Sequence, residues 1–365
     1  MNVQPTRVGI AGLGAVAMTH LAAYTELPYV DVVGGADPAP GARALATERF
    51  GFPCYASVDE LLATQSLDLL CVLSSVNTHR SLVESAARHR VPVLCEKPLA
   101  VSVVDALAMD AACRSAGVSL AYGSSYRFLA PIAEARRVVA EGLIGRVDLV
   151  VQTFVGGRGP ARQEPIGSEH YPAGGPGGTG LGLFDHGIHF LDYIPWLLDS
   201  RIEAVFGRGN RSGSPLRPEF AYLTLANDIT AHLLCYDGTW STKLPNEGTW
   251  ALGEHWEIST GYSPAGVWAR DTVEVHVHGS HGALRVSPYA HRLVLSDASG
   301  IRDMPVAGRP SPGHFASQLE AVLGALRRGE PAPVPARAGI EALIALEALY
   351  ESQRTGSVQV IASRV

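Results

Sequence analysis

The chain has 365 residues, of which 47% are hydrophobic and 18% are charged, and its formal net charge is −6. This composition excludes an intrinsically disordered chain, and the length favours two domains over one. A mildly acidic chain without a run of Lys or Arg lacks the positive charge of a nucleic-acid-binding protein, so we expect no nucleic-acid partner. We find neither a secretory signal nor an apolar stretch of membrane-spanning length, and we therefore expect a cytoplasmic protein without a membrane partner.

Strand-like and helix-like patterns alternate over residues 1–125, with short connections between them. The strand-like segments are residues 8–11, 30–36, 68–73, 91–95 and 118–122. The first helix-like segment follows a glycine turn and extends to about residue 27. The others are residues 41–50, 79–89 and 102–115. This alternation predicts βαβ units and a parallel sheet buried on both faces.

The pattern changes after Pro131. The strand-like segments are then residues 146–155, 221–225, 229–236, 256–260, 272–278 and 293–296, and a loop rich in glycine and proline covers 156–180. The helix-like segments are residues 132–141, 184–198, 314–328 and 338–352. Residues 126–365 are therefore predicted to form a second, α+β domain with an open, mainly antiparallel sheet, which makes the fold class of the whole chain α/β.

The first predicted strand leads directly into Gly12-Leu13-Gly14-Ala15-Val16-Ala17, which has the form G-x-G-x-x-A. The first two glycines let the chain turn sharply and bring the backbone N–H groups of Gly12, Gly14, Ala15 and Val16 against a pyrophosphate. Ala17 permits close packing of the helix on the strand. Because the motif follows a strand and opens a helix, it predicts a dinucleotide-binding Rossmann domain over residues 1–125.

Asp37 stands at the end of the second predicted strand, 25 residues after Gly12. A carboxylate there can accept hydrogen bonds from an adenosine ribose and repels a 2′-phosphate, which favours NAD over NADP as the cofactor and leaves NADP possible. The alternative interpretation is a turn residue ahead of Pro38.

Glu96-Lys97-Pro98 comes directly after the fourth predicted strand. Ligands of open α/β sheets bind beyond the carboxyl ends of the strands, so Lys97 is expected at the same sheet edge as the glycine turn. A partly desolvated lysine beside a nicotinamide cation would have a lowered pKa and could polarise a hydroxyl group. A cis Lys97–Pro98 bond is one way of aiming this side chain. The alternative is a solvated Glu-Lys pair ahead of a helix.

A second polar cluster follows the glycine-rich loop, where Asp185 and His189 stand four residues apart in a predicted helix. Side chains at this spacing project from one helix face, and a carboxylate beside an imidazole suits general acid–base catalysis. The alternatives are an N-cap aspartate with a packed core histidine, or a metal site that also uses His186. No further ligand cluster is evident, and the five widely spaced cysteines form neither a zinc pattern nor a disulfide framework. We therefore expect no metal.

Together these motifs resemble those of the Gfo/Idh/MocA family, which includes glucose–fructose oxidoreductase and inositol dehydrogenase. The resemblance rests on GIAGLGAVA with Asp37, Asn77-Thr78-His79, LCEKPLA, Tyr126-Arg127-Phe128 with Pro131, and GLFDHGIHFLD. It implies an N-terminal Rossmann domain, and a C-terminal domain that binds substrate and assembles into a homodimer or homotetramer through its open sheet. It also implies hydride transfer between a nicotinamide and a secondary hydroxyl of a sugar, a cyclitol or a related compound.

The resemblance assigns roles to individual residues. The catalytic positions are Lys97, Asp185 and His189. Cofactor binding is expected of Gly12, Gly14, Ala15, Val16, Asp37, Ser74, Asn77, His79, Glu96 and Lys97. Substrate binding is expected of Lys97, Tyr126, Arg127, Asp185, His186 and His189.

The chain departs from the family pattern in the segment that precedes Asp185. Many members carry a Trp-Arg pair there, whereas residues 164–180 read EPIGSEHYPAGGPGGTG. This departure bears on the identity of the substrate more than on the type of reaction.

Two alternative functions remain open at this point. One is an enzyme that uses tightly held NAD to oxidise a sugar transiently for elimination or glycoside cleavage, in which NADH would not accumulate with product. The other is a non-catalytic sensor of a dinucleotide or sugar, which would not need Lys97, Asp185 and His189 together.

Overall fold

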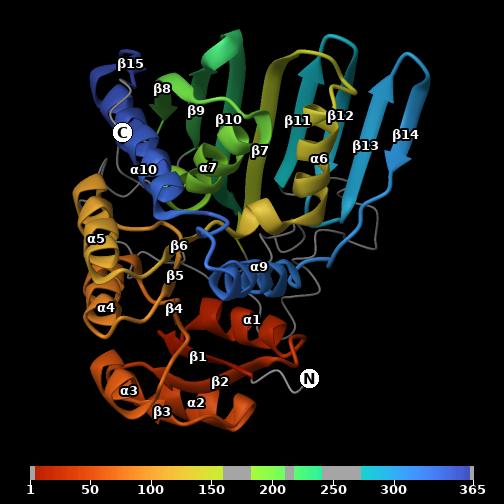
Figure 1. The fold of residues 1–365 in the computed structure, drawn as a ribbon. Helices are drawn as coiled ribbons and strands as arrows, with labels where there is room; N and C mark the ends of the chain where they lie inside the picture. Colours follow the sequence, from red (N-terminus) through yellow and green to blue (C-terminus); the bar gives the residue numbers. More distant parts are fainter. Residues whose placement is uncertain (1–4, 159–181, 210–217, 241–272, 362–365) are drawn as a thin grey trace. The chain divides into compact units, whose positions relative to one another are not determined.

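The computed structural model describes residues 5–158, 182–209, 218–240 and 273–361 (Figure 1). The predicted strand at 256–260 and nearly all of the predicted loop at 156–180 lie outside these residues. The chain divides into two compact units, one made of Met1–Ser124 with Pro312–Ile340 and the other of Ser125–Ser311 with Glu341–Val365. Residues 312–340 therefore belong to the first unit, although they follow the second unit's strands in the sequence. The expected division into 1–125 and 126–365 assigns this segment to the second domain.

The first unit contains a six-stranded sheet in which every neighbouring pair is parallel. The strand order is β3-β2-β1-β4-β5-β6. The strands are β1 (Thr6–Ala11), β2 (Val30–Ala36), β3 (Cys54–Tyr55), β4 (Leu69–Val72), β5 (Val93–Glu96) and β6 (Leu120–Gly123). Their apolar side chains are almost completely buried, as in β4, because both faces of a parallel sheet are covered. The predicted parallel sheet is confirmed.

The helices of this unit are α1 (Ala15–Tyr24), α2 (Pro40–Phe50), α3 (Val58–Thr64), α4 (Val76–Arg88), α5 (Val103–Ala116), α9 (His314–Arg328) and the start of α10 (Ala336–Thr355). Of the helices that connect the strands, α1, α2, α4 and α5 correspond to predicted helices, whereas α3 was not predicted. Local signals set their ends: the Ser57 and Ser102 hydroxyls accept N–H groups from the first turns of α3 and α5, and Gly51 and Gly117 end α2 and α5 in the left-handed conformation. Helix α9 packs against α1.

The second unit contains a nine-stranded sheet with the order β14-β13-β12-β11-β7-β10-β9-β8-β15. The strands are β7 (Val147–Arg158), β8 (Ile202–Gly209), β9 (Glu219–Leu225), β10 (Ile229–Trp240), β11 (Val273–Gly279), β12 (Gly282–Ser287), β13 (Arg292–Asp297), β14 (Gly300–Met304) and β15 (Gln359–Val360). All neighbouring pairs are antiparallel except β7 and β10. The predicted open, mainly antiparallel sheet is therefore confirmed.

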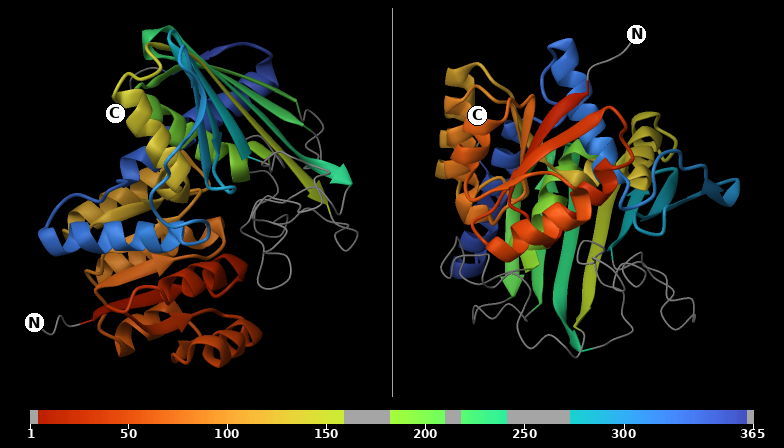
Figure 2. Two further views of the ribbon diagram at one scale, coloured as in Figure 1. Left: turned by 90° about the vertical axis from the view of Figure 1, so that its right-hand side faces the viewer. Right: turned by 90° about the horizontal axis from the view of Figure 1, so that it is seen from below.

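One face of this sheet carries the helices of the second unit (Figures 1 and 2). They are the 3₁₀ turn η1 (Ser125–Phe128), α6 (Ala130–Ala140), the π-helical turn η2 (Gly182–Gly187), α7 (Ile188–Leu198) and the remainder of α10. The short turn η3 (Ala226–Asp228) connects β9 to β10. Alternate residues of the strands point toward these helices, so that Leu223 and Ala231 are buried while their neighbours Tyr222 and His232 are exposed.

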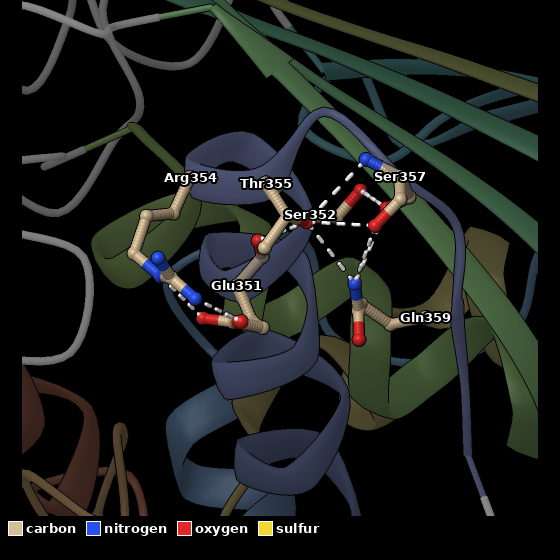
Figure 3. A network of polar contacts seen from close by, with 6 residues as sticks. All are labelled: Glu351, Ser352, Arg354, Thr355, Ser357 and Gln359. Carbon is tan, nitrogen blue, oxygen red and sulfur yellow. Dashed lines mark hydrogen bonds and ion pairs between the residues drawn. The ribbon is translucent and has the colours of Figure 1, made fainter.

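The end of α10 is joined to β8 and to β15 by a small polar network (Figure 3). The Ser352 hydroxyl donates to the Ser357 carbonyl oxygen at 2.6 Å and accepts from the Gly207 backbone N–H at 3.0 Å. Thr355 and Gln359 extend the network around Ser357. These bonds satisfy backbone groups at a helix terminus and lead the chain into β15.

Of the helices that the structure describes, none combines the length and the hydropathy that crossing a bilayer would require. The five cysteines are free thiols, and all except the half-buried Cys54 are buried.

Candidate functional site

The glycine turn connects β1 to α1 at the carboxyl edge of the first sheet. Gly12 has a φ of +90°, a conformation that glycine adopts without strain. A Cβ atom on Gly12 would lie 2.6 Å from Ser74 Cα and 2.7 Å from Ser74 N, so no larger residue fits. The turn after β4, which contains Ser74, therefore lies directly against the glycine turn.

The start of α1 has the features of an anion-binding helix terminus. Its N-cap is Gly14, which supplies no capping side chain, and the first helical turn carries no acidic residue. Gly14 and Ala15 are exposed, and open space surrounds the position that a Gly14 Cβ would take. Ala17, in contrast, is completely buried. Exposed backbone at the positive end of a helix fits a pyrophosphate group, as the sequence motif predicts.

Asp37 follows β2 and is anchored to the same turn. One carboxylate oxygen accepts the Leu13 N–H at 2.9 Å and the other accepts the Ala39 N–H at 2.8 Å. The carboxylate is thereby fixed beside the glycine turn, and it also forms the turn ahead of α2. The Arg43 guanidinium donates to the carbonyl oxygens of Asp37 and Pro38, so a positive charge lies close to this corner.

His79 links two of the loops at this sheet edge. Its ring is completely buried in α4. Nε2 lies 3.0 Å from the Ser74 carbonyl oxygen, and Nδ1 lies 3.1 and 3.2 Å from the carbonyl oxygens of Pro98 and Leu99. Burial lowers the pKa of this histidine, although the backbone hydrogen bonds oppose that shift. This geometry makes His79 a support for the loops, while Asn77, two residues earlier in α4, is exposed.

Lys97 comes immediately after β5 and is half-buried. The Lys97–Pro98 peptide bond is cis, as the sequence interpretation allowed. The Lys97 backbone N–H donates to Glu96 Oε2 at 2.9 Å. Glu96 is itself buried and contacts His20 of α1. Nothing in the sequence marks His20 as a site residue, because a single histidine in an apolar helix does not differ from an ordinary core residue.

Asp185 lies in the π-helical turn η2 rather than in a regular α-helix, so the expectation of one continuous α-helix from residue 184 is wrong for its first turn. The Leu183 N–H is held at 2.9 Å by the buried carboxylate of Glu219, which fixes the start of the turn. Asp185 Oδ2 lies 3.5 Å from His186 Nε2, and the His186 ring stacks on Phe154 at 4.0 Å. π-helical turns of this kind are frequent at functional sites.

His189 occupies the first turn of α7 and is buried. The Tyr126 ring lies nearly parallel to the imidazole, with centroids 3.9 Å apart and an interplanar angle of 14°. The Tyr126 hydroxyl in turn accepts a hydrogen bond from the Tyr289 hydroxyl at 3.1 Å. The phenol ring of Tyr126 therefore fixes the plane of the imidazole.

Arg127 forms a bidentate pair with Asp192, one turn after His189 in α7. Nε donates to Asp192 Oδ2 at 2.9 Å and Nη2 donates to Oδ1 at 2.6 Å. The exposed fractions of the two side chains are 11% and 0%. The Arg127 guanidinium thereby ties η1 to α7, and its expected part in substrate binding stays a prediction.

The structure thus gathers the predicted cofactor residues and Lys97 in the first unit, and Tyr126, Arg127, Asp185, His186 and His189 in the second. In the described part of the chain, no group of three or more His, Cys, Asp or Glu side chains is arranged to hold a metal ion.

A parallel sheet with this glycine turn at its carboxyl edge, joined to a second unit that presents Asp185 and His189, defines the class of two-domain dinucleotide-dependent oxidoreductases. Residues 6–124 match the model of an oxidoreductase family with an NAD-binding Rossmann fold, and residues 132–285 match that of the GFO/IDH/MocA C-terminal domain. The chain therefore belongs to the Gfo/Idh/MocA family of oxidoreductases, which confirms the resemblance in its motifs.

Two named relatives align with almost the whole chain. A D-apiose dehydrogenase of Paraburkholderia graminis is 27% identical and covers 97% of this chain and 89% of its own length. An inositol 2-dehydrogenase of Paenarthrobacter aurescens is 26% identical, with coverages of 95% and 96%. An oxidoreductase of Agrobacterium radiobacter, solved with NAD⁺, L-tartaric acid and magnesium, shares the fold with a TM-score of 0.79 at 21% identity and covers 99% of each chain.

Proposed function

We propose that this protein is an NAD-dependent dehydrogenase that oxidises a secondary hydroxyl of a sugar or cyclitol. The observation that carries the proposal is the order of β1, β4 and β5 in the parallel sheet. These neighbouring strands end at Ala11, Val72 and Glu96, so the glycine turn, the Ser74 turn and Lys97 emerge at one sheet edge. This edge is where ligands of open α/β sheets bind.

The cofactor would be held by groups already positioned for it. The start of α1 offers backbone N–H groups to a pyrophosphate, and the anchored Asp37 carboxylate offers acceptors to ribose hydroxyls. The same carboxylate disfavours a 2′-phosphate, which supports NAD over NADP. A nicotinamide held by these groups would supply the hydride acceptor for oxidation of the substrate carbon, or the hydride donor in the reverse direction.

Proton transfer falls to residues of the second unit. We assign His189 as the base that takes the hydroxyl proton, because an imidazole titrates near neutral pH and the ring of this one is fixed by Tyr126. Asp185 supports the developing imidazolium or binds a neighbouring hydroxyl, and His186 is a candidate substrate contact. We assign to Lys97 the polarisation of the hydroxyl oxygen.

The substrate class follows from the relatives, whose names include D-apiose and inositol dehydrogenases. A second hydroxyl-binding group such as Asp185 suits a polyol. We further propose that the protein works as a homodimer or homotetramer, because Phe220 and Tyr222 expose large aromatic side chains on the open sheet.

Absorbance at the NADH band tests this function directly. The protein is mixed with NAD⁺ or NADP⁺ and a panel that contains D-apiose, inositols, free sugars, glycosides and sugar nucleotides. We expect NADH to accumulate with one class of compound and Lys97→Ala to abolish that signal. Product formation without NADH accumulation would contradict the proposal in favour of an enzyme that recycles bound NAD. Binding of NAD with no turnover of any compound would favour a sensor.

A further inference from the structure

A buried series of polar groups connects α1 to the backbone of Lys97. His20 Nε2 lies 3.1 Å from Glu96 Oε1, and Glu96 Oε2 accepts the Lys97 N–H at 2.9 Å. On the other side of the ring, His20 Nδ1 lies 2.8 Å from the Tyr24 hydroxyl. The imidazole thus bridges a helix and the carboxylate that precedes Lys97.

These groups are deeply buried. The exposed fraction is 0% for His20 and 6% for Glu96, and the Phe315 ring packs on the imidazole with centroids 4.1 Å apart. Removing a carboxylate and an imidazole from water costs free energy that their mutual contact must offset, whereas apolar side chains of similar volume would incur no such cost. Such an arrangement therefore indicates a task other than stability.

We propose that His20 is a positioning residue for Lys97, acting through Glu96. This inference rests on the proposed function, in which Lys97 polarises the reacting oxygen. Held by His20, the Glu96 carboxylate keeps one oxygen on the Lys97 backbone and stays directed into the core. Released from His20, it would have the ammonium group of the adjacent residue as an alternative partner.

The pairing matters for the chemistry of the lysine. A carboxylate that forms an ion pair with an ammonium group stabilises its charged form and raises its pKa. It also directs the side chain toward the carboxylate and away from a substrate oxygen. His20 prevents both effects by engaging Glu96.

The directions of the hydrogen bonds show that His20, and not Tyr24, donates to Glu96. An ionised Glu96 only accepts, so His20 Nε2 carries the proton between them. With the proton on Nε2, Nδ1 is an acceptor, and the Tyr24 hydroxyl, which burial keeps protonated by raising its pKa, donates to Nδ1 at 2.8 Å. Tyr24 thus contacts the opposite side of the ring from Glu96. Tyr24→Phe therefore keeps the contact between His20 and Glu96, and it serves as the matched control.

The sequence provides a probe that needs no substrate, because Lys97 and Lys243 are its only lysines. Reductive methylation with ¹³C-formaldehyde places an NMR label on each lysine, and Lys97→Arg identifies the Lys97 signal by its loss. Titration of that signal in the full-length protein then reports the pKa of Lys97. NADH fluorescence measured in parallel reports whether each variant still binds cofactor.

In His20→Phe we expect the pKa of Lys97 to rise by about one unit, with the Kd for NADH within about threefold of wild type. In His20→Gln, whose amide can still donate to Glu96, the pKa of Lys97 should equal that of the wild-type protein. It should also be unchanged in Tyr24→Phe. In the double variant His20→Phe/Glu96→Gln the upward shift is absent, because the carboxylate is gone. Turnover of any panel compound falls about tenfold to a hundredfold in His20→Phe and recovers in His20→Gln.

An unchanged Lys97 titration in His20→Phe with NADH binding intact would overturn the proposal, as would an equal shift in Tyr24→Phe. Should His20→Phe fail to fold, His20→Asn gives the same test, because its shorter side chain does not reach Glu96. The titration is independent of turnover, so failure of the substrate panel would contradict the proposed function and leave this inference standing.

Discussion

The ring of Tyr126 lies almost parallel to that of His189, with centroids 3.9 Å apart. The two residues are 63 positions apart in the sequence and come from different elements, η1 and α7. Sequence motifs identify both residues as site candidates and give Tyr126 a role in binding substrate. The stacking adds a second role, which is to hold the imidazole plane for proton transfer, while the role in binding substrate stays a prediction.

Replacement of Tyr126 separates ring stacking from hydrogen bonding. Tyr126→Phe keeps the stacked ring, so kcat should remain within about threefold of wild type. Tyr126→Ala frees the imidazole to rotate, and kcat should fall about tenfold to a hundredfold because general base catalysis requires a fixed orientation. Steady-state kinetics with the compound found in the panel measure both. Equal losses in the two variants would assign the effect to the hydroxyl and its bond to Tyr289.

The Arg127–Asp192 pair predicts a large loss of stability when one partner is removed. Asp192→Asn leaves a guanidinium that is 11% exposed without its charge partner, and the free energy of unfolding should drop by about 3–5 kcal/mol. Urea denaturation measures this change. The matched control is Arg127→Met/Asp192→Leu, which should be less destabilised than Asp192→Asn because no charge stays buried. A loss below about 1 kcal/mol, as for an exposed ion pair, would contradict the assignment.

His79 predicts a dependence of stability on pH. Burial holds the pKa of His79 below the ordinary value of 6.5. As the pH falls below 6.5, the histidine therefore becomes protonated in the unfolded chain but stays neutral in the folded protein. The free energy of unfolding should therefore decrease on acidification from pH 6.5 toward the folded-state pKa, by up to about 1.4 kcal/mol per pH unit for this group.

The control for this prediction is His79→Gln, which lacks the titrating ring. Urea denaturation of both proteins at a series of pH values gives the difference in their free energies of unfolding. As the pH falls, the free energy of unfolding should decrease more in the wild-type protein than in His79→Gln. A difference that does not change with pH would mean that His79 does not titrate differently in the two states.

The Asp37 carboxylate is expected to determine the preference for NADH over NADPH. Asp37→Ser removes the charge that repels a 2′-phosphate, and Arg43 already lies at this corner. The ratio of the Kd for NADPH to that for NADH should therefore fall about tenfold or more. Fluorescence titration with both cofactors measures the ratio, and Asp37→Asn tests whether the charge alone is responsible. An unchanged ratio in Asp37→Ser would remove Asp37 as the determinant.

Much of the first unit could be predicted from the sequence, because its signals are local. Gly12 and Gly14 mark the turn, and the apolar runs that form β4 and β5 reveal strands buried on both faces. The missed elements are short: β3 has two residues and α3 has seven, too few for a periodic pattern. In the second unit the sequence pattern missed β8, β12, β14 and β15. Strand β15 has only two residues, and the side chains of β14 are largely exposed and carry no apolar signal.

Other features depend on contacts between distant residues. The partner of Arg127 is 65 positions away, and the Glu219 carboxylate that fixes the π-helical turn is 36 positions from Leu183. The amphipathic pattern of 314–328 predicts α9 but does not tell which sheet it covers, and the structure places it against α1. Tertiary packing decides these points, and a local pattern does not contain it.

Lys97 is expected to contribute far more to the reaction than to the binding of the cofactor. The most direct measurement compares kcat and the Kd for NADH in Lys97→Ala with those in Lys243→Arg, which alters the other lysine of the chain. We predict that Lys97→Ala loses at least about a hundredfold in kcat while its Kd for NADH stays within about threefold, and that Lys243→Arg behaves like wild type. Near-normal turnover in Lys97→Ala would contradict the account.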